Sequence, residues 1–389
     1  MRRILPYGRQ WIDEDDATAV IAALRSDWLT TGPKVAEFEA NLAEKVGAKF
    51  AVAVSSGTAA LHLACLVTGV TAGDLVVSSP LTFVASVNCA LYCGARVDFV
   101  DIDRRTYNLD ASELAHYVVK SRGDDGIKAL VPVHFAGQPC DMERIAASAR
   151  KTGAVVIEDA CHALGARWKD SGGRWQTVGS CSHSDMVVFS FHPVKHITTA
   201  EGGAVTTNSE ELCERLRTLR NHGIIRDSTK LEGVDGPWSY EVRELGFNYR
   251  LSDLQCALGI SQLHKLDRWV ERRRELAALY DRLLGALEGV MLPVQRENTR
   301  SSYHLYVVQV PQRSKVFRLL HEHGVKVQVH YPPVHLHPLY QERFGFRRGD
   351  FPQTEAYYEG AMSLPLFPQM SDGDVEYVVD TLRATLAAL

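Results

Sequence analysis

The sequence predicts an α/β protein with a mostly parallel, seven-stranded sheet between helices, followed by a smaller α+β domain. Short apolar, β-branched runs alternate with helix-length stretches between about residues 50 and 206. These runs are continuously apolar, which is typical of strands that are buried on both faces of a parallel sheet. A chain of 389 residues also exceeds what one core usually serves, so two packed domains are expected.

Seven segments have the length and composition of buried strands. They lie at 51–54, 75–78, 97–100, 129–133, 154–157, 186–189 and 203–205. The intervening patterns predict helices, including 58–66 after the first strand, 83–91 after the second and 210–219 after the last.

A long helical pattern, 252–287, is rich in Leu, Arg and Glu, and we expect it to link two domains. We therefore divide the chain into a large domain, 1–250, and a second part, 251–389, that holds this helix and a small C-terminal domain. The turn-rich segment 232–237 is a candidate mobile loop. In the C-terminal part the pattern predicts strands at 304–310 and 325–329 and helices at 316–323 and 373–389.

Composition excludes several classes of protein. Hydrophobic residues make up 46% and charged residues 23%, as in ordinary globular enzymes, and the net charge of -4 predicts no attraction to nucleic acid or an anionic membrane. The eight cysteines form no C-x-x-C pair, which favours free thiols in a reducing cytoplasm. The opening residues 1–10 lack an apolar core, so no signal peptide is expected, and no apolar run is long enough to span a membrane.

Lys195 is the best candidate for a catalytic lysine. It follows a buried strand in the segment Ser190-Phe191-His192-Pro193-Val194-Lys195. A Schiff-base lysine needs a fixed position and partial desolvation, which favours its neutral amine, and a strand edge that opens into a cleft provides both. Ser190 carries a hydroxyl that can hold an anion. Taken alone, a solvated surface lysine is the commoner interpretation.

Asp159 and His162 follow the strand 154–157 directly. A carboxylate at the end of a buried strand is well placed to meet a ring nitrogen, and as the partner of a pyridinium it would keep a cofactor protonated as an electron sink. His162 is placed to cover a ring face or touch a phenolate oxygen. A helix-capping aspartate and a buried structural histidine are the ordinary alternatives.

Two further elements suit a phosphate and an aromatic ring. Small residues follow the strand 51–54, at 55–60, where the start of a helix favours an anion through its amides and dipole. Phe83 follows the strand 75–78 and is placed to stack on an aromatic cofactor. An ordinary βα connection and a core phenylalanine are the alternatives. Together with the strand-end acid and lysine, these elements supply the four partners that pyridoxal phosphate requires, at one edge of one sheet.

On these residues the chain resembles the sugar aminotransferases of the DegT/DnrJ/EryC1/StrS family, which have the fold type I of pyridoxal-phosphate (PLP) enzymes. The resemblance covers nearly the whole chain. The family's order is kept by Gly57-Thr58, Thr82-Phe83, Glu158-Asp159, Ser190 to Lys195, Glu201-Gly202-Gly203, Gly246 to Arg250, His330-Tyr331 through Pro338, and Ser363-Leu364-Pro365.

The resemblance implies a role for each matching residue. Lys195 would bind the cofactor covalently, Asp159 would contact its pyridine nitrogen and Phe83 would stack on its ring. Asn248 matches a residue that reaches the phosphate in the neighbouring subunit, which implies a homodimer with shared active sites. Phosphate contacts are implied for Gly57, Thr58 and Ser190, a position near the ring for His162, and we add Tyr7, Thr31, His330 and Tyr331 as candidate substrate contacts.

Within the family, segments 5–10 and 28–33 look closest to the branch that works in pseudaminic-acid synthesis. That branch aminates C4 of UDP-4-keto-6-deoxy-N-acetyl-altrosamine with L-glutamate, which leaves as 2-oxoglutarate while the cofactor becomes pyridoxamine phosphate. One departure is visible, because the family often has Gly where Ala200 stands. Alanine costs little there unless the position needs φ > 0.

Four rival functions remain at this stage. A transaminase for another nucleotide keto sugar, either perosamine-like or a 3-keto sugar, differs only in its substrate. A PLP-dependent sugar dehydratase has a histidine in place of the lysine in one branch, and here His196 lies beside Lys195. A regulatory protein on the same fold would be expected to lose Lys195 or Asp159. A metal site would have to use Cys161, His162, Cys181, His183 and His192, whose spacing matches no common zinc pattern, so no metal is expected.

Overall fold

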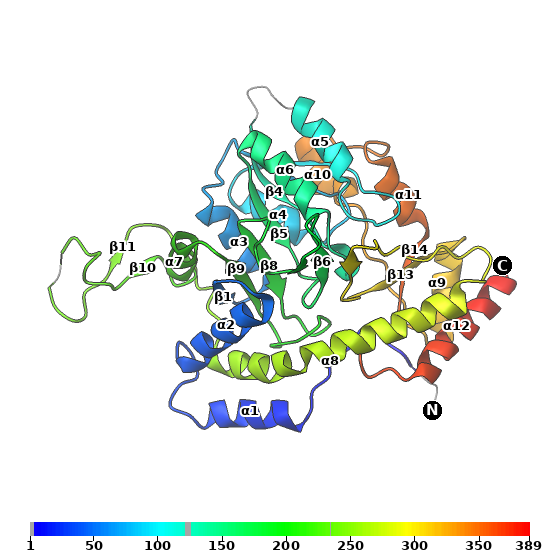
Figure 1. The fold of residues 1–389 in the computed structure, drawn as a ribbon, viewed down its shortest axis with the longest axis horizontal. Helices are drawn as coiled ribbons and strands as arrows, with labels where there is room; N and C mark the ends of the chain where they lie inside the picture. The colour runs from blue at the N-terminus through cyan, green and yellow to red at the C-terminus, as the bar shows by residue number, and fades with distance from the viewer. Residues whose placement is uncertain (1–3, 121–125, 234) are drawn as a thin grey trace.

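A computed structural model of the protein describes residues 4–120, 126–233 and 235–389 and shows a sheet covered by helices on both faces (Figure 1). All seven predicted strands join one sheet in the order β1-β9-β8-β5-β4-β2-β3. Only β9 is antiparallel to its neighbours, so the prediction of a mostly parallel sheet is confirmed. The strands are β1 (Phe50–Val54), β2 (Leu75–Ser78), β3 (Arg96–Phe99), β4 (Ile127–Val131), β5 (Val155–Asp159), β8 (Met186–Ser190) and β9 (Gly203–Thr207).

The sheet is apolar on both faces because successive side chains of a strand point to opposite sides. In β1, Ala51 and Ala53 pack with one layer of helices, whereas Val52 and Val54 pack with the other. The first layer contains α2, α5, α6 and the start of α8, and the second contains α3, α4 and α7. These helices are α2 (Pro33–Val46), α3 (Gly57–Val67), α4 (Ala85–Tyr92), α5 (Ala111–Lys120), α6 (Met142–Thr152), α7 (Glu210–Leu219) and α8 (Asp253–Leu284).

The long helix α8 connects the sheet to the C-terminal elements (Figure 1). It begins at Ser252, whose hydroxyl forms a capping box with Gln255. Leu263 and Leu266 belong to the core under the sheet, whereas Leu276 and Leu284 pack in a separate core. The division of the chain at residue 250 stays a prediction. The C-terminal elements are β13 (Tyr306–Gln309), β14 (Ala361–Leu364), α9 (Arg313–Glu322), α10 (Pro338–Phe344), α11 (Pro352–Gly360) and α12 (Asp372–Ala387).

Smaller elements complete the described residues. The predicted loop 232–237 lies in the hairpin between β10 and β11, which projects away from the rest of the molecule beyond α7 (Figure 1). Val234 of this loop, like residues 1–3, lies outside the described residues, so mobility of the loop stays a prediction. No helix in the described residues is long and apolar enough to cross a membrane. The remaining elements are α1 (Glu14–Leu24), β6 (Arg167–Lys169), β7 (Trp175–Thr177), β10 (Ile224–Ile225), β11 (Glu241–Val242), β12 (Thr299–Arg300) and the short 3-10 helices η1 (Phe135–Gly137) and η2 (Val334–Leu336).

The predicted strand at 325–329 is wrong. The segment makes only two isolated bridges, from Val325 to Leu5 and from Gln328 to Ser363. The amide of Val327 donates to the carbonyl of Val325 at 3.2 Å, so this amide is not available to a ladder. The alternating valines reflect burial in the C-terminal core rather than membership of a sheet.

Ala200 occupies the left-handed region of backbone conformation, with φ 64°. Alanine in place of the family's glycine therefore lowers the stability of the fold at this position, because a Cβ crowds the backbone at positive φ. Three residues on, a Cβ on Gly203 would lie 2.5 Å from the carbonyl carbon of Ser56, so any larger residue there would force the backbone to shift. The chain is therefore strained at Ala200 in the loop before β9 and closely packed at Gly203, the first residue of β9.

We expect Ala200→Gly to raise the free energy of unfolding by about 0.5–1 kcal/mol, because relief of the crowded Cβ outweighs the added backbone entropy of glycine. Urea unfolding followed by tryptophan fluorescence measures this change. Ala72→Gly is the matched control, because Ala72 is also exposed but has no positive φ, and it should lower the stability. Equal losses in the two variants would contradict the account of Ala200.

Candidate active site

The carboxyl ends of β1, β2, β5 and β8 open onto a cavity of about 310 Å³. This is the edge at which open α/β sheets bind ligands. Of the twelve candidate residues, two, Asn248 and Thr31, do not line the cavity and are exposed elsewhere. The other ten do line it, and they are Tyr7, Gly57, Thr58, Phe83, Asp159, His162, Ser190, Lys195, His330 and Tyr331.

Lys195 stands in the turn after β8, where its amide donates to the carbonyl of His192 at 2.8 Å. Its side chain is half-buried on the cavity wall. Burial lowers the pKa of the Lys195 ammonium below its usual range, and the nearby Cys161 and Asp159 partly offset this effect. The lysine therefore carries a larger neutral fraction than a surface lysine, as a nucleophilic amine requires.

Asp159 is the last residue of β5, and both of its carboxylate oxygens accept hydrogen bonds from the protein. Oδ2 accepts from the hydroxyl of Ser86 at 2.5 Å, and Oδ1 accepts from the amide of Cys161 at 3.0 Å. Its backbone is held as well, because its amide donates to the carbonyl of Pro132 and its carbonyl accepts from the amide of His134. The carboxylate is therefore fixed at the cavity wall.

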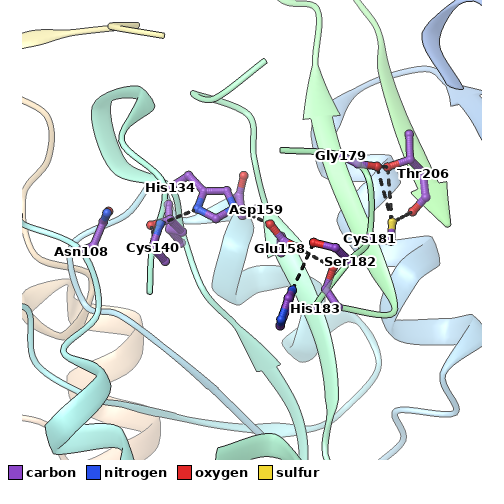
Figure 2. A network of polar contacts seen from close by, with 12 residues as sticks. Asn108, His134, Cys140, Glu158, Asp159, Gly179, Cys181, Ser182, His183 and Thr206 are labelled. Atoms are coloured by element: carbon purple, nitrogen blue, oxygen red, sulfur yellow. Dashed lines mark hydrogen bonds and ion pairs between the residues drawn. The ribbon is translucent and has the colours of Figure 1, made fainter. Parts of the chain in front are cut away.

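The neighbouring Glu158 forms a separate buried network behind Asp159 (Figure 2). Its carboxylate lies 2.6 Å from Nε2 of His134 and accepts from the hydroxyl of Ser184 at 2.5 Å. Because Nδ1 of His134 accepts from the amide of Cys140, Nε2 carries the proton and donates to Glu158. This network ties the end of β5 to the segments that follow β4 and precede β8, which supports the position of Asp159.

The first turn of α3 forms an anion site beside Ser190. The amides of Ala59 and Ala60 are satisfied by Ser56, which leaves those of Gly57 and Thr58 at the open start of the helix. A Cβ on Gly57 would lie 3.0 Å from Cβ of Ser190, so glycine lets the helix start approach this serine closely. Two backbone amides, two hydroxyls and the helix dipole can thus meet one phosphate.

Aromatic side chains enclose the other end of the cavity. Phe83 is 55% exposed toward it, and its ring centroid is 5.9 Å from that of Tyr331. The Tyr331 hydroxyl is 3.1 Å from Nε2 of His162, whose ring lies 4.4 Å from His304. Burial lowers the pKa of His162 and His304 well below the usual range, and it raises that of Tyr331. All three groups are therefore neutral at physiological pH.

Two buried ring nitrogens, Nδ1 of His162 and Nδ1 of His304, have no hydrogen-bond partner within the described residues. Both residues line the cavity, so a bound molecule can satisfy them. Burial, reinforced by the charge of Lys195, also lowers the pKa of His330 to about 3, which leaves this histidine neutral. His162, His304 and His330 therefore add no positive charge to the cavity.

Several lining residues were not among the sequence candidates. Glu201 stands in the Glu201-Gly202-Gly203 match to the family but was given no role there, and His304 gave no local signal because a histidine at the start of a strand pattern is ordinary. Cys161 and His192 stood out only as metal candidates. The remaining additions are Ser56, Leu61, Thr82, Ala85, Val133 and Val194.

The metal candidates do not form one cluster. Cys181 contacts Gly179 and Thr206, and Nδ1 of His183 is 3.2 Å from the hydroxyl of Ser182 (Figure 2). Within residues 4–120, 126–233 and 235–389, no group of three or more His, Cys, Asp and Glu side chains has the arrangement needed to hold a metal ion.

The cavity fits pyridoxal phosphate in its charges and its unsatisfied atoms. The start of α3 with Ser190 suits the phosphate, and Lys195 suits the aldehyde carbon. Asp159 suits the pyridine nitrogen, and the unpartnered Nδ1 of His162 can meet a polar group of the ring. The roles of the individual residues remain predictions.

A family comparison agrees with this assignment. The model of the DegT/DnrJ/EryC1/StrS aminotransferase family matches residues 10–383. The spore coat polysaccharide biosynthesis protein SpsC of Bacillus subtilis is 40% identical over 386 residues, with 97% of this chain and 96% of that protein covered. The UDP-4-amino-4,6-dideoxy-N-acetyl-beta-L-altrosamine transaminase of Campylobacter jejuni is 38% identical over 388 residues, with 98% of each chain covered.

A solved structure with the same fold contains the cofactor. The putative sugar aminotransferase Spr1654 from Streptococcus pneumoniae, known in a PLP-form and a PMP-form, is 29% identical to this chain with a TM-score of 0.89. The superposition covers 99% of both chains.

Proposed function

The chain belongs to the DegT/DnrJ/EryC1/StrS aminotransferase family, and on that basis we propose that it transfers an amino group from L-glutamate to the C4 ketone of a UDP-linked 4-keto-6-deoxy sugar in pseudaminic-acid synthesis. The coarser assignment is firm, because fold, family and relatives agree on a PLP-dependent sugar aminotransferase of fold type I. The sugar, the nucleotide and the donor belong to the proposal.

The observation that carries the chemistry is the meeting of Lys195 and Asp159 in one cavity, beside the open start of α3. They come from the ends of β8 and β5, which are neighbouring strands. When bound, pyridoxal phosphate supplies an electron sink for the electron pair left on the donor's Cα. The chain's own residues then have to bind the cofactor, keep its ring protonated and move one proton.

Each of these tasks has a residue suited to it. Lys195 would hold the cofactor covalently at rest, and its Nζ, when free and neutral, would be the base that takes the proton from Cα of the donor and returns it to the cofactor. Asp159 pairs with the pyridine N–H and so keeps the positive charge on the ring. Phe83 and His162 enclose the ring and exclude water, and Tyr7, His330 and Tyr331 line the side from which a sugar would approach.

The dehydratase alternative has less support. His196 is buried, its Nε2 lies 3.1 Å from the carbonyl of Ser302, and it does not line this cavity. Lys195 does line it, so the residue positioned to meet the cofactor is a lysine. A non-catalytic regulatory role would not explain why Lys195 and Asp159 lie together in one cavity.

We also propose a homodimer with shared active sites. Asn248 is exposed and lies outside its own cavity, as expected of a residue that reaches the phosphate bound by a partner subunit. Exposed apolar side chains precede Asn248 in the chain, with Trp238 71% exposed and Leu245 85% exposed. Covering them would stabilise a dimer. Thr31 is likewise exposed, and we keep it as a candidate contact with a sugar.

A panel of nucleotide keto sugars tests the proposed substrate. With glutamate as donor, we expect UDP-4-keto-6-deoxy-N-acetyl-altrosamine to be aminated at C4, with kcat/KM about 100-fold above that of 3-keto or perosamine-type substrates, because a site built for one set of hydroxyls leaves polar groups unpaired with another. NMR of the products gives the aminated position, and release of 2-oxoglutarate identifies the donor.

The same panel can fail in three informative ways. A different preferred nucleotide sugar would contradict the substrate and keep the enzyme class. A deoxygenated product without a new amine would favour the dehydratase. Acceptance of only amino acids or simple aldehydes would contradict the sugar assignment altogether.

A further inference from the structure

Two buried hydroxyls stand in line behind Asp159. Ser86, on α4, is 0% exposed and its Oγ lies 2.5 Å from Oδ2 of Asp159. Thr82 is 2% exposed and its Oγ1 lies 2.6 Å from Oγ of Ser86. Thr82 lines the cavity, whereas Ser86 does not, so Ser86 acts on the cavity only through its neighbours.

The direction of the hydrogen bonds follows from the donors available. An ionised carboxylate can only accept, so the hydroxyl proton of Ser86 points to Asp159. That is the only proton on Ser86 Oγ, and the short contact to Thr82 must therefore use the proton of Thr82. The order is Thr82 to Ser86 to Asp159, and each oxygen in the chain can polarise the next.

This chain of hydroxyls fixes the rotation of the Asp159 carboxylate. Ser86 holds Oδ2 while the amide of Cys161 holds Oδ1 at 3.0 Å, so turning the carboxylate about its Cβ–Cγ bond would break both contacts. Hydrogen bonds to a carboxylate are charge-assisted and stronger than neutral ones, so both contacts resist this rotation. A carboxylate held in one direction is what a partner of the pyridine nitrogen requires.

The same turn carries the residue at the ring face. The amide of Ser86 donates to the carbonyl of Phe83 at 3.2 Å, in the segment that leads from β2 into α4. Phe83, the residue proposed to stack on the cofactor ring, and Ser86, whose hydroxyl holds Asp159, are thus three residues apart in one hydrogen-bonded turn. A single turn therefore sets both the position of Phe83 against the cofactor ring and the direction of the Asp159 carboxylate.

We propose that Ser86, supported by Thr82, is a positioning residue that keeps the Asp159 carboxylate aimed at the pyridine nitrogen of the cofactor. The inference rests on the assignment of Asp159 to that nitrogen. Ser86 touches neither cofactor nor substrate, and its effect is transmitted through Asp159. Side chains that orient the ligands of a metal in this way commonly change affinity or activity by about 10- to 100-fold when they are removed, and we expect a comparable effect here.

The test uses the full-length protein loaded with pyridoxal phosphate that carries ¹⁵N in its ring. In Ser86→Ala, we expect the ring-nitrogen NMR signal to move toward the position of the unprotonated ring. We also expect the rate of amino transfer from glutamate to fall about 10- to 100-fold at little change in KM. Ser86→Thr restores a hydroxyl and should recover most of both properties, which a purely steric account does not predict.

Two further variants keep the test decisive. Ser78→Ala is the matched control, because Ser78 is equally buried but its hydroxyl donates to the carbonyl of Val131 at 2.7 Å, away from Asp159. Its nitrogen signal should match the unaltered protein. Thr82→Val is close to isosteric and should give a smaller shift in the same direction as Ser86→Ala, so it serves if Ser86→Ala does not fold.

The outcomes separate the inference from its premise. If Ser86→Ala or Thr82→Val leaves the nitrogen signal and the rate as they are in Ser78→Ala, the positioning role is wrong. If Asp159→Asn also leaves the nitrogen signal unchanged, then the assignment of Asp159 itself fails. A shift with Asp159→Asn and none with Ser86→Ala would overturn only the role of Ser86.

Discussion

Replacing Lys195 with alanine should lower the rate of amino transfer by on the order of 10⁴-fold or more, because it removes both the covalent anchor and the base that moves the proton. The visible absorbance of the covalently attached cofactor should disappear at the same time. Pyridoxal phosphate can still bind through the start of α3 and Ser190, so equilibrium dialysis should show residual, weaker binding. Steady-state kinetics and an absorbance spectrum measure the two losses independently.

The control for this variant is Lys49→Ala. Lys49 is exposed, precedes β1 and does not line the cavity, so its loss removes a lysine without touching the site. Its activity and spectrum should match those of the unaltered protein. Full transaminase activity in Lys195→Ala would show that another amine binds the cofactor and transfers the proton, and it would contradict the assignment.

Replacing Asp159 with asparagine should slow amino transfer by on the order of 10²- to 10³-fold, a loss comparable to that of other preorganised electrostatic partners. The amide is neutral and cannot hold a proton on the pyridine nitrogen, so the ring becomes a weaker electron sink. Stopped-flow absorbance of the half-reaction with glutamate measures the rate directly. The cofactor should remain covalently bound, because Lys195 is unchanged.

Glu158→Gln is the matched control for Asp159→Asn. The two carboxylates are neighbours on β5, but Glu158 bonds to His134 and Ser184 in the network behind the site (Figure 2). Its replacement should reduce stability with little change in the half-reaction of the folded protein. A half-reaction that is slowed equally in both variants would indicate a general disturbance of β5 rather than a role for Asp159.

Much of the fold could be predicted from the sequence for a physical reason. Strands buried on both faces are continuously apolar, so the seven strands of the sheet were visible as runs such as Val76-Val77 and Val187-Val188. The candidate site followed from the same pattern, because the carboxyl ends of parallel strands meet at one edge. Only β9 runs against its neighbours, and no property of its own sequence indicates direction.

What could not be predicted depends on contacts between distant parts of the chain. Nothing in the sequence around Ser86 distinguishes it from other helical serines, because its partner Asp159 is 73 residues away and only the fold brings the two together. The φ of Ala200 is set by the packing of its loop and not by its side chain. The false strand at 325–329 arose because an alternating pattern reports burial, and here the amide of Val327 bonds to Val325 and only isolated bridges form on either side of it.

Peptide mapping of the reduced protein tests the central claim most directly. The holoenzyme is treated with borohydride, which makes the bond between cofactor and lysine permanent, and is then digested and sequenced by mass spectrometry. The account predicts a phosphopyridoxyl group on the peptide that contains Lys195, at about one per chain. A label on any other lysine, or no label on a protein that still transfers amino groups, would contradict it.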